Sequence, residues 1–565
     1  MVSKKPRIVI IGAGMAGLTA ANKLYTSANS KQAFELSVVE GGSRIGGRIS
    51  SSEFCGDRIE TGATWIHGIE GSPVYKIAQE TNSLHSDQPW ECMDGIPGHP
   101  VTVAEGGHEL NPSFVEPISK LFKNLMDFIQ GNAIDSDGFA TEILKHCARS
   151  CGPGNLSVGS FLRKGLEAYW GVVDDQKGFK GWGNWSRKSL QEAVFAMHES
   201  TQRTFTSADD LCTLDYNAER EYIMFPGEEI TIARGYSSVI ESLASVLPVG
   251  MIQLGRRVEK IEWQADGLDG IHMENGYCNN SRPVKLHFCD GSTMSADHVI
   301  VTVSLGVLKR GTSQDSGMFN PPLPSFKTGA ISRLGYGVVN KVFLQLSQET
   351  TDFPFLQMVF HPQDSELRHP KIPHWIRRTS FLCPIYSNSR IVLSWFTGQE
   401  ALELESLTEE EIVSGFSATV SNLLPSKPTH KSCNGTTDNP GTTIPEGKQV
   451  KFEKALRTQW GTNPLFLGSY SYIAVGSSID DMDTLAEPLP QNTHLPAHKL
   501  HHHCKFYLQE KQHTEHTIQP PMEHTLVGSE KPTGFSNTTI ILVTVAGQDP
   551  QNPAISCHHL SSTFS

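Results

Sequence analysis

The chain has 565 residues, too many for a single hydrophobic core, so we expect two or more domains. Hydrophobic residues make up 38% of it and charged residues 19%, which are ordinary values for a globular protein. The net charge of −13 disfavours a nucleic-acid partner and mildly favours a cationic ligand, although ordinary solubility explains the same charge equally well.

The cysteines and the two ends of the chain bear on its location. Eleven cysteines are scattered without a Cys-x-x-Cys pair, which predicts a reducing compartment and no zinc site. The first apolar strand begins too early to leave room for a signal peptide. The apolar run at 540–546 is far shorter than the ~20 residues of a membrane span, and the chain does not end in Ser-Lys-Leu. We therefore expect a cytoplasmic protein without a membrane partner.

The N-terminal residues predict a βαβ unit that binds a dinucleotide. An apolar strand is expected at 8–11, a helix at 18–24, and between them stands Gly12-Ala13-Gly14-Met15-Ala16-Gly17. In such a motif Gly12 permits a tight turn, Gly14 lets the backbone approach a pyrophosphate, and Gly17 lets helix and strand pack closely. The helix N-terminus would present N–H groups to the phosphates.

A second apolar strand at 34–39 ends at Glu40, where an acid would bond a ribose hydroxyl. The next residues, 41–48, resemble the glycine–arginine extension of FAD-binding oxidoreductases. Close backbone approach at Gly47, together with Arg48, suits a second phosphate contact. The alternative is a plain glycine loop with a solvated arginine.

Beyond residue 48 the sequence predicts helical and strand-rich stretches in alternation, without internal repeats. Ser186 is a candidate helix N-cap. In chain order we expect a glycine-bounded loop at 62–68, helices at 112–173, 186–197 and 235–247, an acid-rich stretch at 209–229, a strand at 252–263, a hairpin of 284–288 and 298–303, strands at 337–346 and 391–395, and a loop or linker at 426–447.

Several segments together resemble the flavin-containing amine oxidases, most closely the plant polyamine oxidases of the cytosolic, spermine-oxidase-like branch. They are residues 8–48, 62–68, 225–229, 301–309, 334–341 and 468–472. The resemblance implies an α/β and α+β fold, with a dinucleotide-binding (Rossmann-like) FAD domain and a discontinuous substrate domain of mixed sheet and helices. The implied division gives 1–80, 235–320 and 451–490 to the FAD domain, and 81–234 and 321–450 to the substrate domain.

The resemblance also implies an enzyme, an FAD-dependent polyamine oxidase. A hydride would pass from the carbon beside a secondary amine of spermine, thermospermine or spermidine to flavin N5. The imine would then hydrolyse, and dioxygen would reoxidise the flavin and give hydrogen peroxide. The amine is charged near neutral pH but must react as the neutral base. We therefore expect a substrate tunnel in which carboxylates bind the distal ammonium groups and an aromatic cage surrounds the reacting nitrogen. The sequence leaves open which polyamine is oxidised, and on which side of the nitrogen.

Two residues are catalytic candidates. Lys341 stands in the apolar run 338–344, where a lysine is costly without a partner, and the matching lysine of the family holds a water against flavin N5. The alternative is a lysine at a sheet edge. His67 matches the polar residue near the substrate nitrogen in the spermine-oxidase-like branch, and the alternative is a local hydrogen bond.

The remaining candidates bind the cofactor or the substrate, and no metal ligands are expected. The acidic part of the tunnel would use Glu228 and Glu229, and one wall of the cage Tyr470 or Tyr472; a solvated turn and ordinary strand aromatics are the alternatives. The cofactor candidates are Gly12, Gly14, Ala16, Gly17, Glu40, Gly47, Arg48, Gly62, Ala63, Thr64, Trp65 and Val258, the last by its backbone unless it is a plain core valine.

The residues after Pro490 depart from the family, which ends with a Phe-Ala-Gly-Glu-Ala-Thr-His segment and a further helix. The stretch 491–565 is histidine-rich and non-periodic, typical of disorder, and its spacing fits no defined metal-ligand set. Suitable codons for 508–524, read one base earlier, give the family segment in order, so we interpret the tail as a frameshifted reading that transcript sequencing tests. A spliced insert is also expected near 265–283.

The altered tail keeps a second interpretation open, a relative that has lost catalysis because it binds FAD weakly. A histone-demethylating relative is disfavoured, because neither an extra N-terminal helical domain nor a long helical-hairpin insertion is evident. An NAD-dependent dehydrogenase is disfavoured by the extension at Gly46, Gly47 and Arg48.

Overall fold

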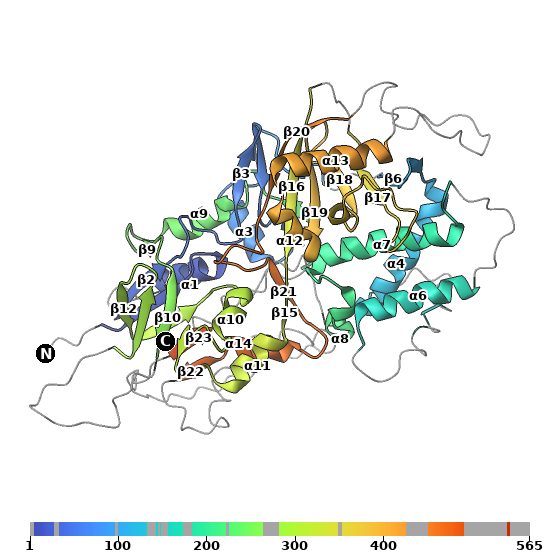
Figure 1. Ribbon diagram of the computed structural model, residues 1–565. Coiled ribbons are helices and arrows are strands. Elements are labelled where there is room, and N and C mark those ends of the chain that lie inside the picture. The colour runs from blue at the N-terminus through green and yellow to red at the C-terminus, as the bar shows by residue number, and fades with distance from the viewer. Residues whose placement is uncertain are drawn as a thin grey trace, which may run out of the picture.

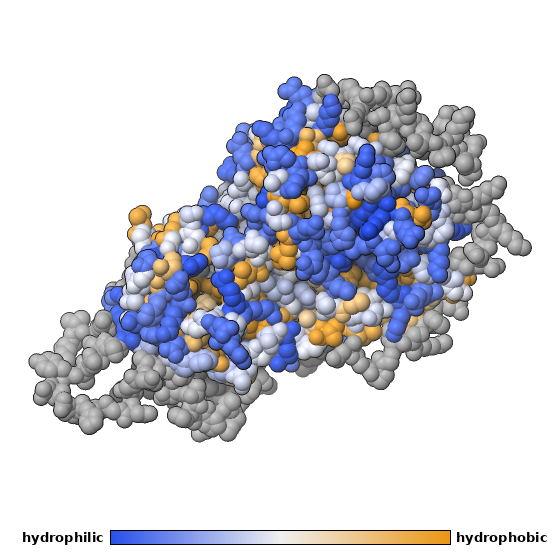
Figure 2. Space-filling view, viewed as in Figure 1, coloured by the Kyte–Doolittle hydropathy of each residue, from blue (hydrophilic) through white to orange (hydrophobic). Residues whose placement is uncertain are grey.

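The computed structural model describes residues 5–27, 33–95, 100–132, 143–144, 147, 156–172, 183–221, 225–263, 282–348, 353–424 and 450–490, and the backbone of 539–542. Two large sheets lie in different halves of an elongated molecule (Figure 1). Figure 2 shows polar and apolar residues intermixed over one face, as is usual for a protein surface in water.

The first sheet has six strands in the order β22-β23-β13-β1-β2-β9. The central strand β1 runs parallel to both neighbours, β2 and β13, and four of its five residues, Ile8 to Ile11, are buried, as expected for a strand covered on both faces. The strands are β1 (Arg7–Ile11), β2 (Glu35–Val39), β9 (Ile252–Gln253), β13 (His298–Val301), β22 (Pro488–Pro490) and β23 (Thr539–Leu542). Helices α1 (Met15–Thr26) and α9 (Ser237–Ser245) share a core with this sheet.

A four-stranded sheet of order β12-β11-β10-β14 adjoins it, and here two sequence predictions were wrong. The expected strand 252–263 is two strands in different sheets, because the chain turns at Gly255 with a φ of 69°. The expected hairpin partner at 298–303 instead joins β1, where Asp297 accepts a hydrogen bond from the Arg7 N–H. The strands are β10 (Val258–Glu262), β11 (Val284–Phe288), β12 (Thr293–Ala296) and β14 (Phe319–Asn320).

The second large sheet has seven strands in the order β20-β16-β19-β18-β17-β6-β7. β16 lies between β20 and β19 rather than at an edge, and all eight of its residues are buried because hydrophobic clusters pack against both of its faces. The strands are β20 (Phe452–Arg457), β16 (Val339–Leu346), β19 (Ile391–Thr397), β18 (Phe381–Pro384), β17 (Leu356–Val359), β6 (Val101–Ala104) and β7 (His108–Glu109). Since β20 pairs with β16, the expected assignment of all of 451–490 to the FAD domain needs correction.

Helices complete the second half of the molecule. α4 (Pro112–Gln130), α6 (Val158–Val172) and α7 (Arg187–Thr206) share one hydrophobic core, and Ser186 caps α7 in a capping box, as predicted. α12 (Gln399–Ser406) and α13 (Glu409–Leu423) pack on the seven-stranded sheet through a second core. None of the helices described is long and apolar enough to cross a membrane.

Shorter helices and strands complete the fold. They are β3 (Ser51–Phe54), β4 (Asp57–Glu60), β5 (Trp65–Ile66), α3 (Pro73–Glu80), α8 (Tyr216–Arg220), β8 (Ile230–Thr231), α10 (Leu305–Gly311), α11 (Ser325–Arg333), β15 (Gly335–Gly337), β21 (Tyr470–Tyr472) and α14 (Ile479–Ala486). Within 491–565, the stretch for which the sequence predicts disorder, the backbone of β23 pairs with β13 and β22. The histidine-rich stretch, most of the expected insert and the linker 426–447 lie outside the described residues.

Candidate active site

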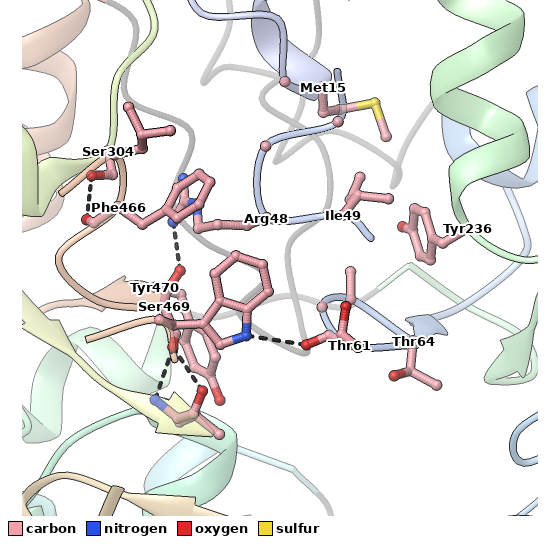
Figure 3. A pocket seen from close by; sticks show the side chains of 18 of the residues that line it. Met15, Arg48, Ile49, Thr61, Thr64, Tyr236, Ser304, Phe466, Ser469 and Tyr470 are labelled. Atoms are coloured by element: carbon pink, nitrogen blue, oxygen red, sulfur yellow. Dashed lines mark hydrogen bonds between the residues drawn. The ribbon is translucent and has the colours of Figure 1, made fainter. Parts of the chain in front are cut away.

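A cavity of about 1040 Å³ lies between the two halves of the molecule. One part of its wall follows the carboxyl ends of β1, β2 and β13, the edge at which parallel α/β sheets bind ligands. The other part comes from the seven-stranded sheet and α7. Figure 3 shows Arg48, Phe466 and Tyr470 on the left of the cavity and Ile49 and Tyr236 on the right.

The turn between β1 and α1 contains three glycines, and the structural reason for each is different. Gly12 has a φ of 108°, a conformation that glycine adopts without strain. A Cβ on Gly17 would lie 1.9 Å from the Gly12 carbonyl oxygen, so helix and turn could not pack. A Cβ on Gly14 would meet nothing nearer than 3.8 Å. Of these three positions, Gly14 is therefore the one at which no contact within the chain requires a glycine. Gly14 faces the cavity at the N-terminus of α1, beside Ala16.

The second glycine segment joins the same wall. Gly46 donates its N–H to the Ala13 carbonyl over 2.8 Å and forms a bridge with Gly14. Gly47 follows with a φ of 60°, and Arg48 donates to the Ser469 carbonyl over 2.6 Å at the cavity wall. The structure thus brings together the two glycine segments that the sequence singled out.

Glu40 fastens the glycine turn to the end of β2. One carboxylate oxygen accepts the Ala13 N–H and the other the Gly42 N–H, each over 2.7 Å. Each oxygen can still accept one further bond, and the residue lines the cavity. Val258, predicted to contact adenine, lines the cavity as well.

The loop before β5 forms the next stretch of wall, from Gly62 to Trp65. A Cβ on Gly62 would lie 1.9 Å from the Arg48 carbonyl oxygen, so the backbone of this loop passes directly over that of the arginine. Thr64 points toward Lys341 rather than toward solvent, as its buried hydroxyl shows. All four predicted positions of this loop therefore reach the cavity.

His67 lies beside Glu229 because β5 and β8 pair antiparallel, with Ile66 opposite Ile230. Its Nδ1 is 3.0 Å from a Glu229 oxygen, and both residues line the cavity. Glu228 is exposed and is not among the lining residues. Of the two predicted acids, the structure brings only Glu229 to the site.

Lys341 occupies the wall on the side of the seven-stranded sheet. Its side chain is buried, and its ammonium donates to the Glu60 carbonyl (2.5 Å), the Thr64 hydroxyl (2.5 Å) and a Glu91 oxygen (3.0 Å). The partner that a buried lysine requires is therefore Glu91, from the segment after α3.

Comparison with known proteins decides the family. The flavin containing amine oxidoreductase model matches residues 15–501. The chain belongs to this family. It is 57% identical over 500 residues to a protein named probable polyamine oxidase 5 from Arabidopsis thaliana, and 40% identical over 519 residues to polyamine oxidase 1 of rice. Each match covers 87% of this chain and 89% of the relative. A human peroxisomal N(1)-acetyl-spermine/spermidine oxidase is 28% identical over 86% of this chain and 87% of that protein.

Membership makes the protein an amine oxidase with FAD as its cofactor. The residues present fit FAD, because Gly14 leaves open space where no contact within the chain requires a glycine. Helix α1 directs its first N–H groups to the same space, which suits a pyrophosphate. Among the described residues of this flavin amine oxidase, Tyr470 is the last in the chain that lines the cavity. Residues 502–565 lie beyond the family match.

The two predicted tyrosines of the amine oxidase lie two residues apart in β21, but their side chains have different neighbours. Tyr470 lines the cavity and its hydroxyl donates to the Thr204 carbonyl. Tyr472 packs against the core of the helical layer and bonds the Thr213 hydroxyl over 3.1 Å. Tyr472 therefore does not reach the site.

Sequence reasoning missed most of the aromatic wall. Trp395 lies directly opposite Lys341 across the β16–β19 pair, and Phe381 lies 5.0 Å from Trp395 between ring centroids. Pairing the two apolar runs could have found Trp395, because cross-strand neighbours share a face. His198 of α7 also lines the cavity. Its Nε2 lies 2.8 Å from the Ser119 hydroxyl, and burial lowers the pKa of His198 to about 4, so the imidazole is neutral.

Proposed function

We propose that this amine oxidase is a polyamine oxidase that acts on a secondary amine of spermine, thermospermine or spermidine. When bound, FAD supplies the acceptor for a hydride from the carbon beside that nitrogen, with dioxygen as the final acceptor. The imine product then hydrolyses to an amine and an aldehyde. The family match supports the cofactor, and the names of the two plant relatives support the substrate class.

One observation carries the proposal: a single cavity joins the open glycine wall at Gly14 to an aromatic wall around Trp395 and Lys341. A cofactor lying along the glycine wall and a substrate lying along the aromatic wall would therefore meet inside one cavity. The glycine wall belongs to an FAD domain that we propose to be Rossmann-like, built on the six-stranded sheet. The substrate domain is then the seven-stranded sheet with its helices, β20 included.

The side chains have separate proposed roles. Glu229 attracts an ammonium group of the polyamine, and its hydrogen bond fixes the orientation of His67 beside the reacting nitrogen. Tyr470 and Trp395 exclude water from that nitrogen, which favours the neutral amine needed for reaction. Lys341 holds a proton at the wall of the cavity, close to where FAD would lie.

The visible absorbance spectrum of the purified, desalted chain tests cofactor binding first. A near-stoichiometric flavin band is expected, and spermine, thermospermine and spermidine should then be added separately under nitrogen. Bleaching by at least one polyamine, but not by butylamine, is the expected result. A bound flavin that none of the three bleaches would contradict the proposed substrate class.

The second candidate is a relative without catalysis, which the tail favours because none of the described residues after Tyr470 lines the cavity. A chain that folds but carries no flavin, even with added FAD, would favour it. The cytoplasmic location expected from the sequence remains a proposal, and fluorescence of a tagged full chain in its native cells tests it.

A further inference from the structure

Glu91 is a buried acid beside the cavity to which neither the sequence nor the family match gives a role. Its side chain is 1% exposed and lies in the turn after α3, outside every motif. Burying an ionised carboxylate costs free energy unless it accepts hydrogen bonds or forms an ion pair. Both of its oxygens are used: one accepts the Glu60 N–H over 2.7 Å, and the other lies 3.0 Å from the Lys341 ammonium.

The three contacts of Lys341 differ in charge. An ammonium has three N–H donors, and here they meet the Glu60 carbonyl, the Thr64 hydroxyl and the Glu91 carboxylate. Only the last bears a negative charge. The Glu60 carboxylate is directed elsewhere, to the Tyr236 N–H and the Ser51 hydroxyl. Glu91 is therefore the counter-ion of Lys341, while the other two acceptors fix the orientation of the ammonium group.

The other groups around Lys341 do not replace this charge. Burial and the neighbouring Glu91 raise the pKa of the Glu60 carboxyl to about 7. Burial likewise raises the pKa of the Cys92 thiol well above its usual range, so Cys92 is neutral. Trp395 and Phe343 present rings with centroids 5.9 and 5.8 Å from the ammonium, and such rings attract a cation without neutralising it.

We propose that Glu91 is a positioning residue, which keeps Lys341 charged and fixed at the cavity wall through an ion pair on the side away from the cavity. The inference rests on the proposed function, because that function places Lys341 beside the cofactor and the substrate. Without Glu91 the buried ammonium has no counter-ion and loses its proton more readily. Any step that depends on the Lys341 proton then fails at a lower pH.

The first experiment is a double-mutant cycle of Glu91→Gln and Lys341→Met, read as the thermal midpoint of the full chain. Each single variant is expected to melt lower by about 2 °C or more, because it leaves one buried charge without its partner. The double variant should recover most of that loss. Independent, additive losses at neutral pH would overturn the proposal.

The second experiment measures the pH profile of polyamine-dependent oxygen consumption. In Glu91→Gln the alkaline fall in kcat should move to lower pH by about one unit or more, and Glu91→Asp should restore the parent profile. Glu105→Gln is the matched control, because Glu105 is equally buried and pairs with Arg377 away from the cavity. It should lower stability without moving the profile.

The outcomes separate the two proposals. A chain that oxidises polyamines with the same profile in Glu91→Gln as in the parent contradicts the role of Glu91 alone. A chain that oxidises no polyamine in any variant contradicts the proposed function. In that case the stability cycle still decides whether Glu91 is the counter-ion of Lys341.

Discussion

The imidazole of His67 and the carboxylate of Glu229 lie 3.0 Å apart, although 161 residues separate them in the chain. The antiparallel pairing of β5 with β8 places them side by side at the cavity. Glu228, the preceding residue, does not line the cavity. Adjacent acids in one motif therefore have different surroundings, which makes their roles separable.

Replacing Glu229 should weaken substrate binding more than replacing Glu228. In Glu229→Gln we expect the KM for the polyamine to rise about tenfold, because an ammonium loses its partner and His67 loses its orienting bond. Glu228→Gln should change KM less than about twofold. Steady-state oxygen consumption measures both. Equal effects of the two variants would mean that the acidic turn acts only through its overall charge.

The glycine turn offers a second pair of variants. Gly14→Ala should leave the melting temperature nearly unchanged, since its Cβ would meet no atom of the chain within 3.8 Å. It should lower FAD affinity about tenfold or more, because the methyl group occupies the space where the pyrophosphate approaches. Gly17→Ala should instead destabilise the fold, since its Cβ would lie 1.9 Å from the Gly12 oxygen. Flavin content and thermal midpoint are the measurements. Full flavin content in Gly14→Ala would place the cofactor elsewhere.

The raised pKa of Glu60 predicts a pH-dependent stability. Burial and Glu91 raise the pKa of this carboxyl from 4.5 to about 7, so folding takes up a proton between those values. Its contribution to stability is fully present below about pH 4.5 and is lost as the pH rises to about 7, by on the order of 3 kcal/mol. The difference in unfolding free energy between Glu60→Gln and the parent should grow over this window. A constant difference would mean that Glu60 stays ionised in the fold.

Local motifs were predictable from sequence because their residues are neighbours in the chain. The turn at Gly12 to Gly17 and the cap at Ser186 depend on spacing within a few residues, and Glu40 belongs to the same βαβ unit as the turn. Lys341 was also predictable as a residue that needs a partner, because its burial follows from the apolar strand around it.

The identity of that partner was not predictable, because Glu91 lies 250 residues away in a turn without a motif. The same limit explains the strand errors. Apolar patterning identifies β9, β10 and β13 as strands, but it does not say which sheet each joins. Tyr470 and Tyr472 show the same limit: two residues apart in β21, they have equivalent places in the strand pattern, and only the tertiary structure says which one reaches the cavity.

The divergent tail supplies a fourth prediction. β23 lies between β13 and β22, so its N–H groups are shared between two neighbours. Ile541→Pro removes one of these donors, and the thermal midpoint should fall by about 2 °C or more, whereas Ile541→Val should be nearly neutral. An unchanged midpoint in the proline variant would show that β23 does not contribute to the stability of the sheet.

The two tyrosines of β21 give the last test, in which one strand supplies both the variant and its control. Tyr470→Phe removes only the hydroxyl that bonds the Thr204 carbonyl, whereas Tyr470→Ala removes the ring from the cavity wall. We expect kcat/KM to fall about tenfold or more in the alanine variant, because water then reaches the reacting nitrogen and favours its charged form. Most of that loss should disappear at high pH, where the amine is neutral in water as well. Tyr472→Ala should lower stability through its packing against the helical core but leave the pH profile unchanged. If the two alanine variants lower kcat/KM equally at every pH, the aromatic wall acts through packing, and its proposed effect on the protonation of the amine is wrong.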